Sequence, residues 1–290
     1  VQETPPVAGQ NTPSPLMPPP EVDRPGEYPH HTPANTTIIT APVLPSVGAS
    51  KKRRRGAWRK KNSTSTTEAD KAAALDIQVG DITREKPEGT RRLAFSNLGP
   101  AGLQLDSASA VQAYRHWLDQ HDIDHIGFVE TQANWPNIPS HQRPEELFRS
   151  DIKPRYNTAY NIHATNKGGR RQQGGTMAMT LGELTARLHG QGRDPSGLGR
   201  WVWHLFRGKD GVRTRVYTAY RPCVSRKQGY STVYTQQKLY FRDQPRPPGT
   251  AAREPRQAFI EDLELDITAR QMAGERIIVM MDANGDVTSG

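Results

Sequence analysis

The 290-residue chain has little cysteine and few large apolar residues. Cys223 is its single cysteine, which excludes an intramolecular disulfide framework and fits a reducing compartment. No apolar run approaches the about 20 residues that a membrane-spanning helix needs, and no signal-peptide pattern opens the chain, so we expect no membrane partner. Hydrophobic residues make up only 34% of the chain, while prolines number 24. We therefore expect part of it to be unfolded.

Positive charge, by contrast, is abundant. Lysine and arginine outnumber aspartate and glutamate by 39 to 30, which gives a formal net charge of +9. A basic balance favours polyanionic partners, with nucleic acid first and an anionic membrane surface second.

Composition divides the chain into two regions. Residues 1–85 open with a stretch rich in proline, serine and threonine that lacks large apolar side chains. Such a stretch cannot bury enough surface to offset its conformational entropy, so we expect this region to be disordered. It can serve as a plain linker or carry proline-rich ligand motifs. The second region, residues 86–290, has the patterns of a folded domain.

A dense basic run lies at positions 51–61 of the first region. Eight of its eleven residues carry positive charge, and an indole stands among them. Such a run can act as a nuclear-import signal or as an arm that binds nucleic acid, with the indole stacked on a base. The alternative is a solvated linker. If the run is a nuclear-import signal, we expect the protein in the nucleus rather than in the cytoplasm. The residues expected to contact nucleic acid are Lys51, Lys52, Arg53, Arg54, Arg55 and Trp58.

The folded region mixes strand and helix patterns. Short apolar or alternating runs predict strands, and apolar residues three and four positions apart predict helices. This order is typical of an α+β or layered α/β domain. The expected strands are 92–98, 123–130, 174–180, a hairpin of 200–206 with 212–220, and 277–281. The expected helices are one that begins after an N-cap at Asp106 or Ser107 and ends near 120, a short one near 181–188, and two more at 234–241 and 256–272.

The last of these strands, 277–281, runs into an Asp-x-Asn pair. Five consecutive apolar residues predict a strand that is covered on both faces. Asp282 and Asn284 then lie two positions apart, so they point from the same side of the pleat. Such a pair can hold a metal, a water or a phosphate. It can equally shape a turn.

Three other predicted strands also end in a polar residue. These are Asn97, Glu130 and Tyr220, and strand alternation places Glu130 on the face of Ile126 and Phe128. Any one of them could be a turn or a cap. Together they supply oxygen ligands for a hard cation, a carboxylate to act on water, and donors for a phosphate.

Five segments resemble the endonuclease/exonuclease/phosphatase superfamily, in its order and with plausible spacing. They are AFSNLGPAGL, IDHIGFVETQ, GGTMAMT, RVYTAYRPC and IIVMMDANGD, spread over residues 91–290. The resemblance implies a four-layer α/β/β/α sandwich of the deoxyribonuclease-like type. The TAYRPC sequence and the tryptophan-rich strand before it look most like the corresponding segments in endonuclease domains of eukaryotic retroelements.

The resemblance also implies an activity, the metal-dependent hydrolysis of a nucleic-acid phosphodiester, with DNA as the expected substrate. Mg²⁺ is the implied ion and Mn²⁺ the alternative, held by Glu130 and Asn97. The implied catalytic residues are Asp282, Asn284, Tyr220 and Glu130, and Arg221 is a further expected nucleic-acid contact. Two alternatives stay open: a degenerate domain that binds nucleic acid without cutting it, and a phosphatase of the same superfamily that acts on a small phosphoester.

The sequence departs from the family pattern in three ways. Cys223 stands where the family often has a phosphate-contacting asparagine, and Met280-Met281 replaces a glycine pair. The family's Ser-Asp-His segment does not occur before Gly290, so we expect the domain to be incomplete at its C-terminus and poorly stable alone. No histidine has a matching context: a surface turn is expected around His121 and His125, and His163 and His204 have no visible partner.

Overall fold

The computed structural model describes residues 36–40, 85–164, 169–227 and 229–285. Over these residues it confirms a mixed α/β fold with two β-sheets and few helices. The basic run at 51–61 lies outside the described residues. Within the region expected to be disordered, Thr36–Thr40 forms a strand, β1. This TTIIT segment consists only of β-branched residues, which favour strands.

The first sheet has five strands in the spatial order β1-β2-β3-β5-β4. The first three run parallel, whereas β5 is antiparallel to β3 and β4 is antiparallel to β5. Parallel pairing brings the carboxyl ends of β2 and β3 to the same edge. The strands are β2 (Arg91–Asn97), β3 (His125–Val129), β4 (Arg155–Ala159) and β5 (Thr176–Thr180).

The second sheet has four strands in the order β6-β7-β8-β9. The predicted hairpin is present as β7 and β8, and β9 returns parallel to β8 with Asp282 opposite Tyr220. The carboxyl ends of β8 and β9 therefore also meet. The strands are β6 (Leu188–Arg193), β7 (Trp201–Arg207), β8 (Arg213–Tyr220) and β9 (Arg276–Asp282).

The helices largely follow the sequence patterns. Ser107 caps the first long helix by accepting a hydrogen bond from Ala110, as its position predicts. The segment near 181–188 forms a 3₁₀-helix rather than an α-helix. The α-helices are α2 (Ala108–Gln120), α3 (Pro144–Leu147), α4 (Val233–Asp243) and α5 (Pro255–Met272); the 3₁₀-helices are η1 (Gly99–Ala101), η2 (Trp135–Asn137), η3 (Ser140–Gln142) and η4 (Gly182–Arg187).

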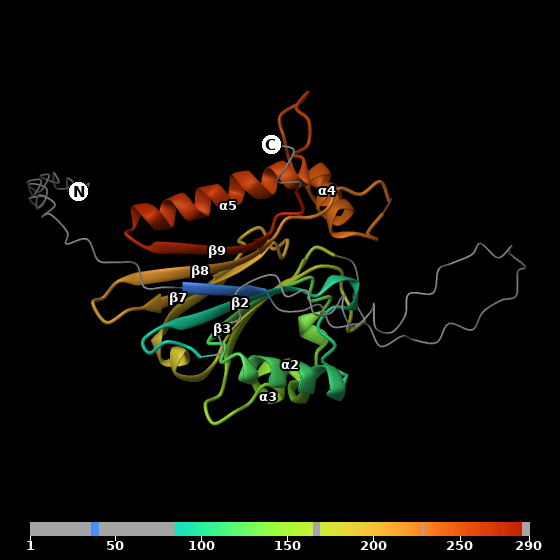
Figure 1. Cartoon of the computed structure of the whole chain (residues 1–290). Helices are drawn as coiled ribbons and strands as arrows, with labels where there is room; N and C mark the ends of the chain where they lie inside the picture. The colour runs from blue at the N-terminus through green and yellow to red at the C-terminus, as the bar shows by residue number, and fades with distance from the viewer. Residues whose placement is uncertain (1–35, 41–84, 165–168, 228, 286–290) are drawn as a thin grey trace, which may run out of the picture. The chain divides into compact units, whose positions relative to one another are not determined.

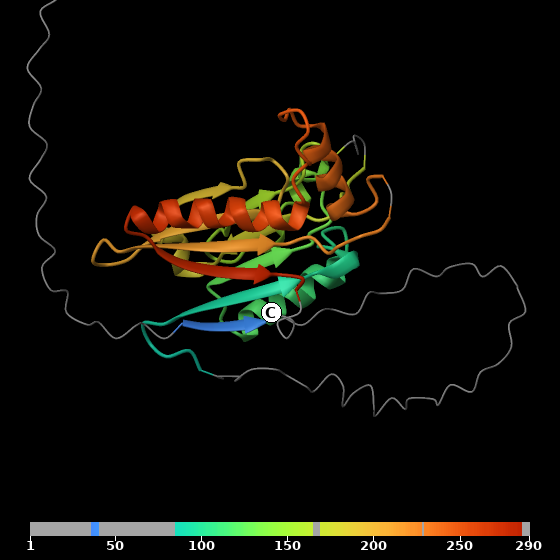
Figure 2. The same cartoon turned by 90° about the horizontal axis from the view of Figure 1, so that it is seen from above.

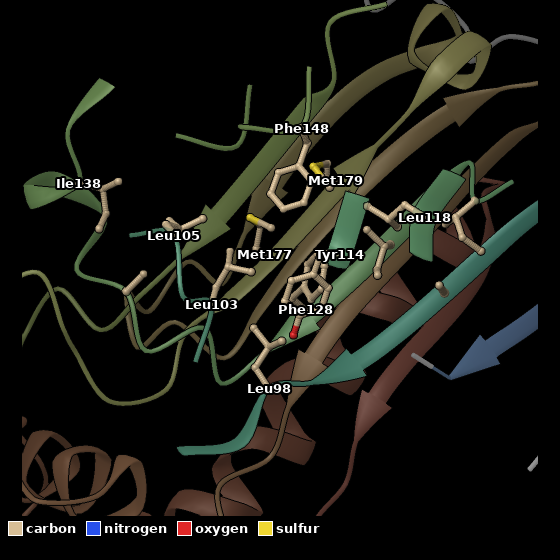
Figure 3. Close-up of a cluster of buried hydrophobic side chains, with 14 of the residues drawn as sticks. Leu98, Leu103, Leu105, Tyr114, Leu118, Phe128, Ile138, Phe148, Met177 and Met179 are labelled. Carbon is tan, nitrogen blue, oxygen red and sulfur yellow. The ribbon is translucent and has the colours of Figure 1, made fainter. Parts of the chain in front are cut away.

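The two long helices lie on the outer sides of the two sheets (Figure 1). One cluster of buried side chains joins α2 to the first sheet through residues such as Tyr114, Phe128 and Met177 (Figure 3). A second cluster joins α5 to the second sheet through Phe259 and Trp201. Each helix thus covers an outer sheet face, which leaves the inner faces of the sheets to meet each other.

Small side chains allow the two inner faces to approach closely. Gly127 of β3 faces Thr218 of β8, and a Cβ on this glycine would lie 2.4 Å from the threonine hydroxyl oxygen. Ala178 of β5 packs in the same way on Val202 of β7. A larger side chain at Gly127 would separate the sheets. The close approach matters for function because it brings the strand ends of both sheets to one place.

Besides β1, sequence periodicity missed the strands β4 and β6. Both are edge strands with few apolar residues, so neither shows the alternation that marks a half-buried strand. In β6, a Cβ on Gly192 would lie 2.2 Å from the indole of Trp203. The glycines that hide this strand from sequence analysis therefore make room for a tryptophan on the neighbouring strand.

The strand β9 differs from the prediction of a strand covered on both faces. Within the described part of the chain it lies at the edge of its sheet. Val279 and Met281 are 37% and 36% exposed, whereas Met280 is buried between the sheets. The apolar run thus correctly predicted a strand, but the prediction that both of its faces are covered is wrong. Over the described residues, none of the helices combines the length and apolar character that crossing a bilayer requires.

Candidate active site

Four strands, two from each sheet, place their carboxyl ends at one end of the molecule. Figure 2 shows β2 (teal) and β9 (red) pointing in the same direction, and β3 and β8 run parallel to them. The polar residues predicted from sequence stand at these ends: Asn97, Glu130, Tyr220 and Asp282, with Asn284 just beyond. The structure brings all five together.

Asn97 is the central residue of this group. Its side-chain nitrogen, Nδ2, donates to Glu130 Oε1 at 3.2 Å and to Asp282 Oδ2 at 2.5 Å. Its side-chain oxygen accepts a hydrogen bond from the backbone nitrogen of Gly99 at 2.7 Å, which fixes the direction of the amide. One amide group therefore holds two carboxylates side by side, one from each sheet.

Glu130 reaches this group through an unusual backbone conformation. Strand alternation predicts it on the face of Ile126 and Phe128, but those two side chains pack under α2 and Glu130 does not join them. Its φ of 55° lies in the left-handed region, which disfavours any residue with a Cβ. This turn directs the carboxylate toward Asn97 and Tyr220 instead. The sequence thus identified the residue and assigned it to the wrong face.

Tyr220 is buried at the end of β8, and its hydroxyl group makes a side-chain hydrogen bond with Glu130. Burial raises the pKa of this phenol well above its usual value, and the nearby Glu130 carboxylate raises it further. The hydroxyl therefore stays protonated at neutral pH. It can donate a hydrogen bond to an anion but cannot act there as a base.

Asp282 and Asn284 form a tight turn at the end of β9. The Asp282 carboxylate accepts a hydrogen bond from the backbone nitrogen of Asn284 at 3.0 Å, and Asn284 has a φ of 44°. The Asn284 side chain donates to the backbone oxygen of Arg221 at 2.6 Å. The left-handed backbone conformation costs less free energy at an asparagine than at most other residues, because asparagine adopts this region more readily. The turn interpretation of this pair is thus confirmed, and its role in a site stays a prediction.

Cys223 and Arg256 complete the surroundings of Asn284. The Cys223 thiol donates to Asn284 Oδ1 at 2.8 Å, so it bonds to the asparagine side chain. Burial raises the pKa of this thiol, as do the carboxylates of Asp282 and Glu130, so it stays protonated at neutral pH. Arg256 Nη1 donates to the backbone oxygens of Pro222 and Asn284 at 3.0 and 2.9 Å. Sequence analysis missed Arg256, because no local pattern links α5 to these loops.

The donor set fits a small hard cation. Glu130 and Asp282 supply two carboxylates beside the Asn97 amide, and Mg²⁺ usually takes one or two carboxylates and keeps several waters. In the part of the chain that the structure describes, no group of three or more histidine, cysteine, aspartate or glutamate side chains forms a metal cluster. Asn97 turns its nitrogen to the carboxylates and its oxygen to Gly99, so its role as a direct ligand stays a prediction.

The four histidines considered in the sequence lie away from this group. Contrary to the expected surface turn, His125 is fully buried between the sheets, where its Nδ1 lies 3.1 Å from the hydroxyl of Thr180. His204, also fully buried, contacts the same hydroxyl at 2.9 Å. His121 does end α2, half-buried. His163 stacks on an α4 tyrosine and is exposed. None of these four bonds to Asp282.

Comparisons with known proteins give only distant neighbours. No family model and no curated protein matches the chain. Among solved structures, it is similar to the catalytic domain of APE2 from Xenopus laevis, with 13% identity over 63% of this chain and 56% of that one, at a TM-score of 0.40. It is also similar to the AP endonuclease LMAP from Leishmania major, with 20% identity over 44% of this chain and 39% of that one, at a TM-score of 0.31. The chain thus matches about half or less of each neighbour's length.

Proposed function

We propose that this chain is a metal-dependent phosphodiesterase that cuts nucleic acid at the site around Asn97. One observation carries the proposal: a single amide holds Glu130 of the first sheet and Asp282 of the second, with Tyr220 bonded to the same cluster. Two carboxylates held together in this way repel each other unless a cation or a proton lies between them. Such a pair suits a divalent cation better than a purely structural role.

Each side chain of the site has a catalytic role that follows from its chemistry. Asp282 orients the attacking water and accepts its proton, since it is the carboxylate next to Asn284. Tyr220 and Asn284 donate hydrogen bonds to the phosphate oxygens, where negative charge grows in the transition state. Glu130, with Asn97 beside it, holds the ion. When bound, Mg²⁺ or Mn²⁺ would polarise the phosphate and stabilise the leaving oxygen.

The finer assignments belong to the same proposal. A net charge of +9 favours a polyanionic substrate, and we take DNA as that substrate and a retroelement endonuclease as the kind of enzyme. The deoxyribonuclease-like four-layer sandwich is the fold we propose for the whole domain. The basic run at residues 51–61 would add contacts to the substrate and favour the nucleus.

Nicking of supercoiled plasmid in Mg²⁺ or Mn²⁺ tests the proposal. We expect the wild-type chain to nick the plasmid, and Glu130→Gln and Asp282→Asn to nick it at least about 100-fold more slowly. Glu264→Gln is the matched control, because this exposed glutamate on α5 lies outside the site and loses the same charge. Equal nicking by all four proteins would refute the metal site. Hydrolysis of an inositol phosphate without plasmid nicking would move the activity to small phosphoesters.

One observation favours a second candidate, a module that binds nucleic acid without cutting it. Among the described residues, no histidine bonds to Asp282, whose two oxygens accept hydrogen bonds from Asn97 and from the backbone of Asn284. No imidazole is thus at hand to share the proton. Salt-dependent retardation of DNA without nicking in either metal would support this candidate.

A further inference from the structure

Two arginine side chains border the turn that follows β9. Arg221 comes directly after β8, and its Nη1 lies 3.8 Å from the position that a Cβ on Gly285 would take. Arg256 lies in the first turn of α5 and donates from Nη1 to the backbone oxygens of Pro222 and Asn284. Both guanidinium groups are half-buried. They therefore lie next to Asn284, one of the two residues to which we assign phosphate contacts.

Neither arginine has an acidic partner in the described part of the chain. The Nε of Arg221 is buried and makes no hydrogen bond there. Two arginines nearby show the usual arrangement: Arg200 and Arg253 both form ion pairs with Asp262, at 2.8 and 2.7 Å. The lack of a partner thus distinguishes Arg221 and Arg256 from the other arginines packed near the start of α5.

The surroundings of Arg221 also oppose its positive charge. Burial and the nearby charge of Arg256 lower the pKa of Arg221, and Glu254 only partly compensates. A buried donor without an acceptor and two like charges side by side both cost free energy. An anion bound between the two groups would remove both costs, because guanidinium groups form strong, directed hydrogen bonds to phosphate oxygens.

We propose that Arg221 and Arg256 form a second phosphate subsite, which binds the backbone phosphate next to the one that is cut. The proposal rests on the function proposed above, since it places Asn284 at the scissile phosphate. Arg256 uses Nη1 to hold the two loops, and within the described residues its Nε and Nη2 bond to nothing else. Its remaining donors and those of Arg221 are free for the anion.

The subsite predicts a substrate class. A compound with a single phosphodiester, such as bis(4-nitrophenyl) phosphate, cannot fill both positions, whereas an oligonucleotide can. The chain should therefore discriminate in favour of polynucleotides through binding at this subsite. Arg221 is the better residue to replace, because its Nε makes no hydrogen bond within the described residues, whereas Arg256 bonds to the carbonyl oxygens of two loops.

Binding of a fluorescent oligonucleotide without metal tests the subsite independently of hydrolysis. We expect Arg221→Gln to weaken binding about tenfold and to lower the slope of log K against log salt by about one. Arg276→Gln is the control. It removes the same charge from an exposed residue at the start of β9, roughly 20 Å along the strand from Asp282.

A neutral methylphosphonate linkage moved along the oligonucleotide then locates the contact. Wild type and Arg276→Gln should lose affinity about tenfold when the neutral linkage reaches the subsite, and Arg221→Gln should not respond at that position. Arg256→Lys, which keeps the charge and a donor for one carbonyl, should show a reduced response. Equal responses by wild type and Arg221→Gln at every position would overturn the subsite.

The outcomes separate the subsite from the catalytic proposal. A position-specific loss of affinity in wild type that is absent from Arg221→Gln, together with no nicking in Mg²⁺, would support the subsite and refute hydrolysis. Nicking by wild type with no difference between Arg221→Gln and Arg276→Gln in binding or salt slope would overturn the subsite and leave hydrolysis standing.

Discussion

The side-chain nitrogen of Asn97 lies 2.5 Å from Asp282 Oδ2, although the two residues are 185 positions apart and belong to different sheets. The same nitrogen donates to Glu130. This contact joins the two halves of the site, and it exists only because small residues such as Gly127 let the inner faces of the sheets meet. Four further predictions follow from this arrangement and from its supports.

Replacing Asn97 by alanine should loosen both carboxylates. Without the shared donor, Glu130 and Asp282 repel each other and hold a cation less precisely. We expect Asn97→Ala to weaken Mg²⁺ binding about 10- to 100-fold, as the loss of groups that orient metal ligands usually does. Calorimetric titration with Mg²⁺ checks this without relying on activity. Unchanged Mg²⁺ affinity in Asn97→Ala, with Glu130→Gln as the reference for loss, would contradict the bridging role.

Glu130 should show a conflict between stability and function. Its φ of 55° is unfavourable for any residue with a Cβ, whereas glycine adopts it freely. We expect Glu130→Gly to be more stable than Glu130→Ala by about 1 kcal/mol, with both variants inactive. Urea denaturation of the two variants measures the difference. Equal stability, or a more stable alanine variant, would show that the left-handed turn relaxes when the carboxylate is removed.

The ion pair of Arg200 and Asp194 should be the main electrostatic support of the region behind Tyr220. Arg200 Nε donates to Asp194 at 2.7 Å with both side chains fully buried, and the Arg200 backbone oxygen accepts from the nitrogen of Tyr220. Arg200→Ala leaves a buried carboxylate without its cation. We expect a loss of about 3–5 kcal/mol in the free energy of unfolding.

The exposed pair of Arg242 and Asp243 provides the control for that measurement. Its two side chains are about 60% exposed and lie at 2.7 Å, so solvent screens their interaction. Asp243→Ala should leave the free energy of unfolding close to that of wild type. Similar effects of the two substitutions would mean that Asp194 finds water or another donor when Arg200 is removed.

The buried histidines should make stability depend on pH below neutrality. Burial lowers the pKa of His125 well below its usual value, and burial together with Arg155 lowers that of His204 to about 3. Unfolded histidines bind protons below about pH 6.5, so the unfolded state gains protons that the folded state does not. Stability therefore falls as pH drops below 6.5, by up to about 1.4 kcal/mol per pH unit for each histidine.

A pair of glutamine variants isolates this effect from that of the carboxylates. His204→Gln should about halve the pH dependence that the pair contributes below pH 6.5. The exposed His163 serves as the control, and His163→Gln should leave the profile unchanged. Parallel profiles for wild type and His204→Gln in urea denaturation would show that the imidazoles become protonated in the folded state.

From the amino-acid sequence alone, local periodicity predicted most of the helices and strands, and the ends of the predicted strands supplied the candidate site residues. Apolar spacing predicted α2 and α5, and alternation predicted β2 and β7, because these patterns arise within a single segment. Asn97, Glu130, Tyr220, Asp282 and Asn284 could be named for the same reason: each follows an apolar run that must end at a sheet edge.

The way in which these residues meet depends on the folding of the whole domain. The left-handed turn at Glu130, the amide bridge from Asn97, the loop contacts of Arg256 and the burial of His125 all depend on residues far apart in the chain. No periodicity in one segment records such contacts. Strand alternation even gave the wrong face for Glu130, because a single backbone dihedral angle overrides the pleat at the point where the strand ends.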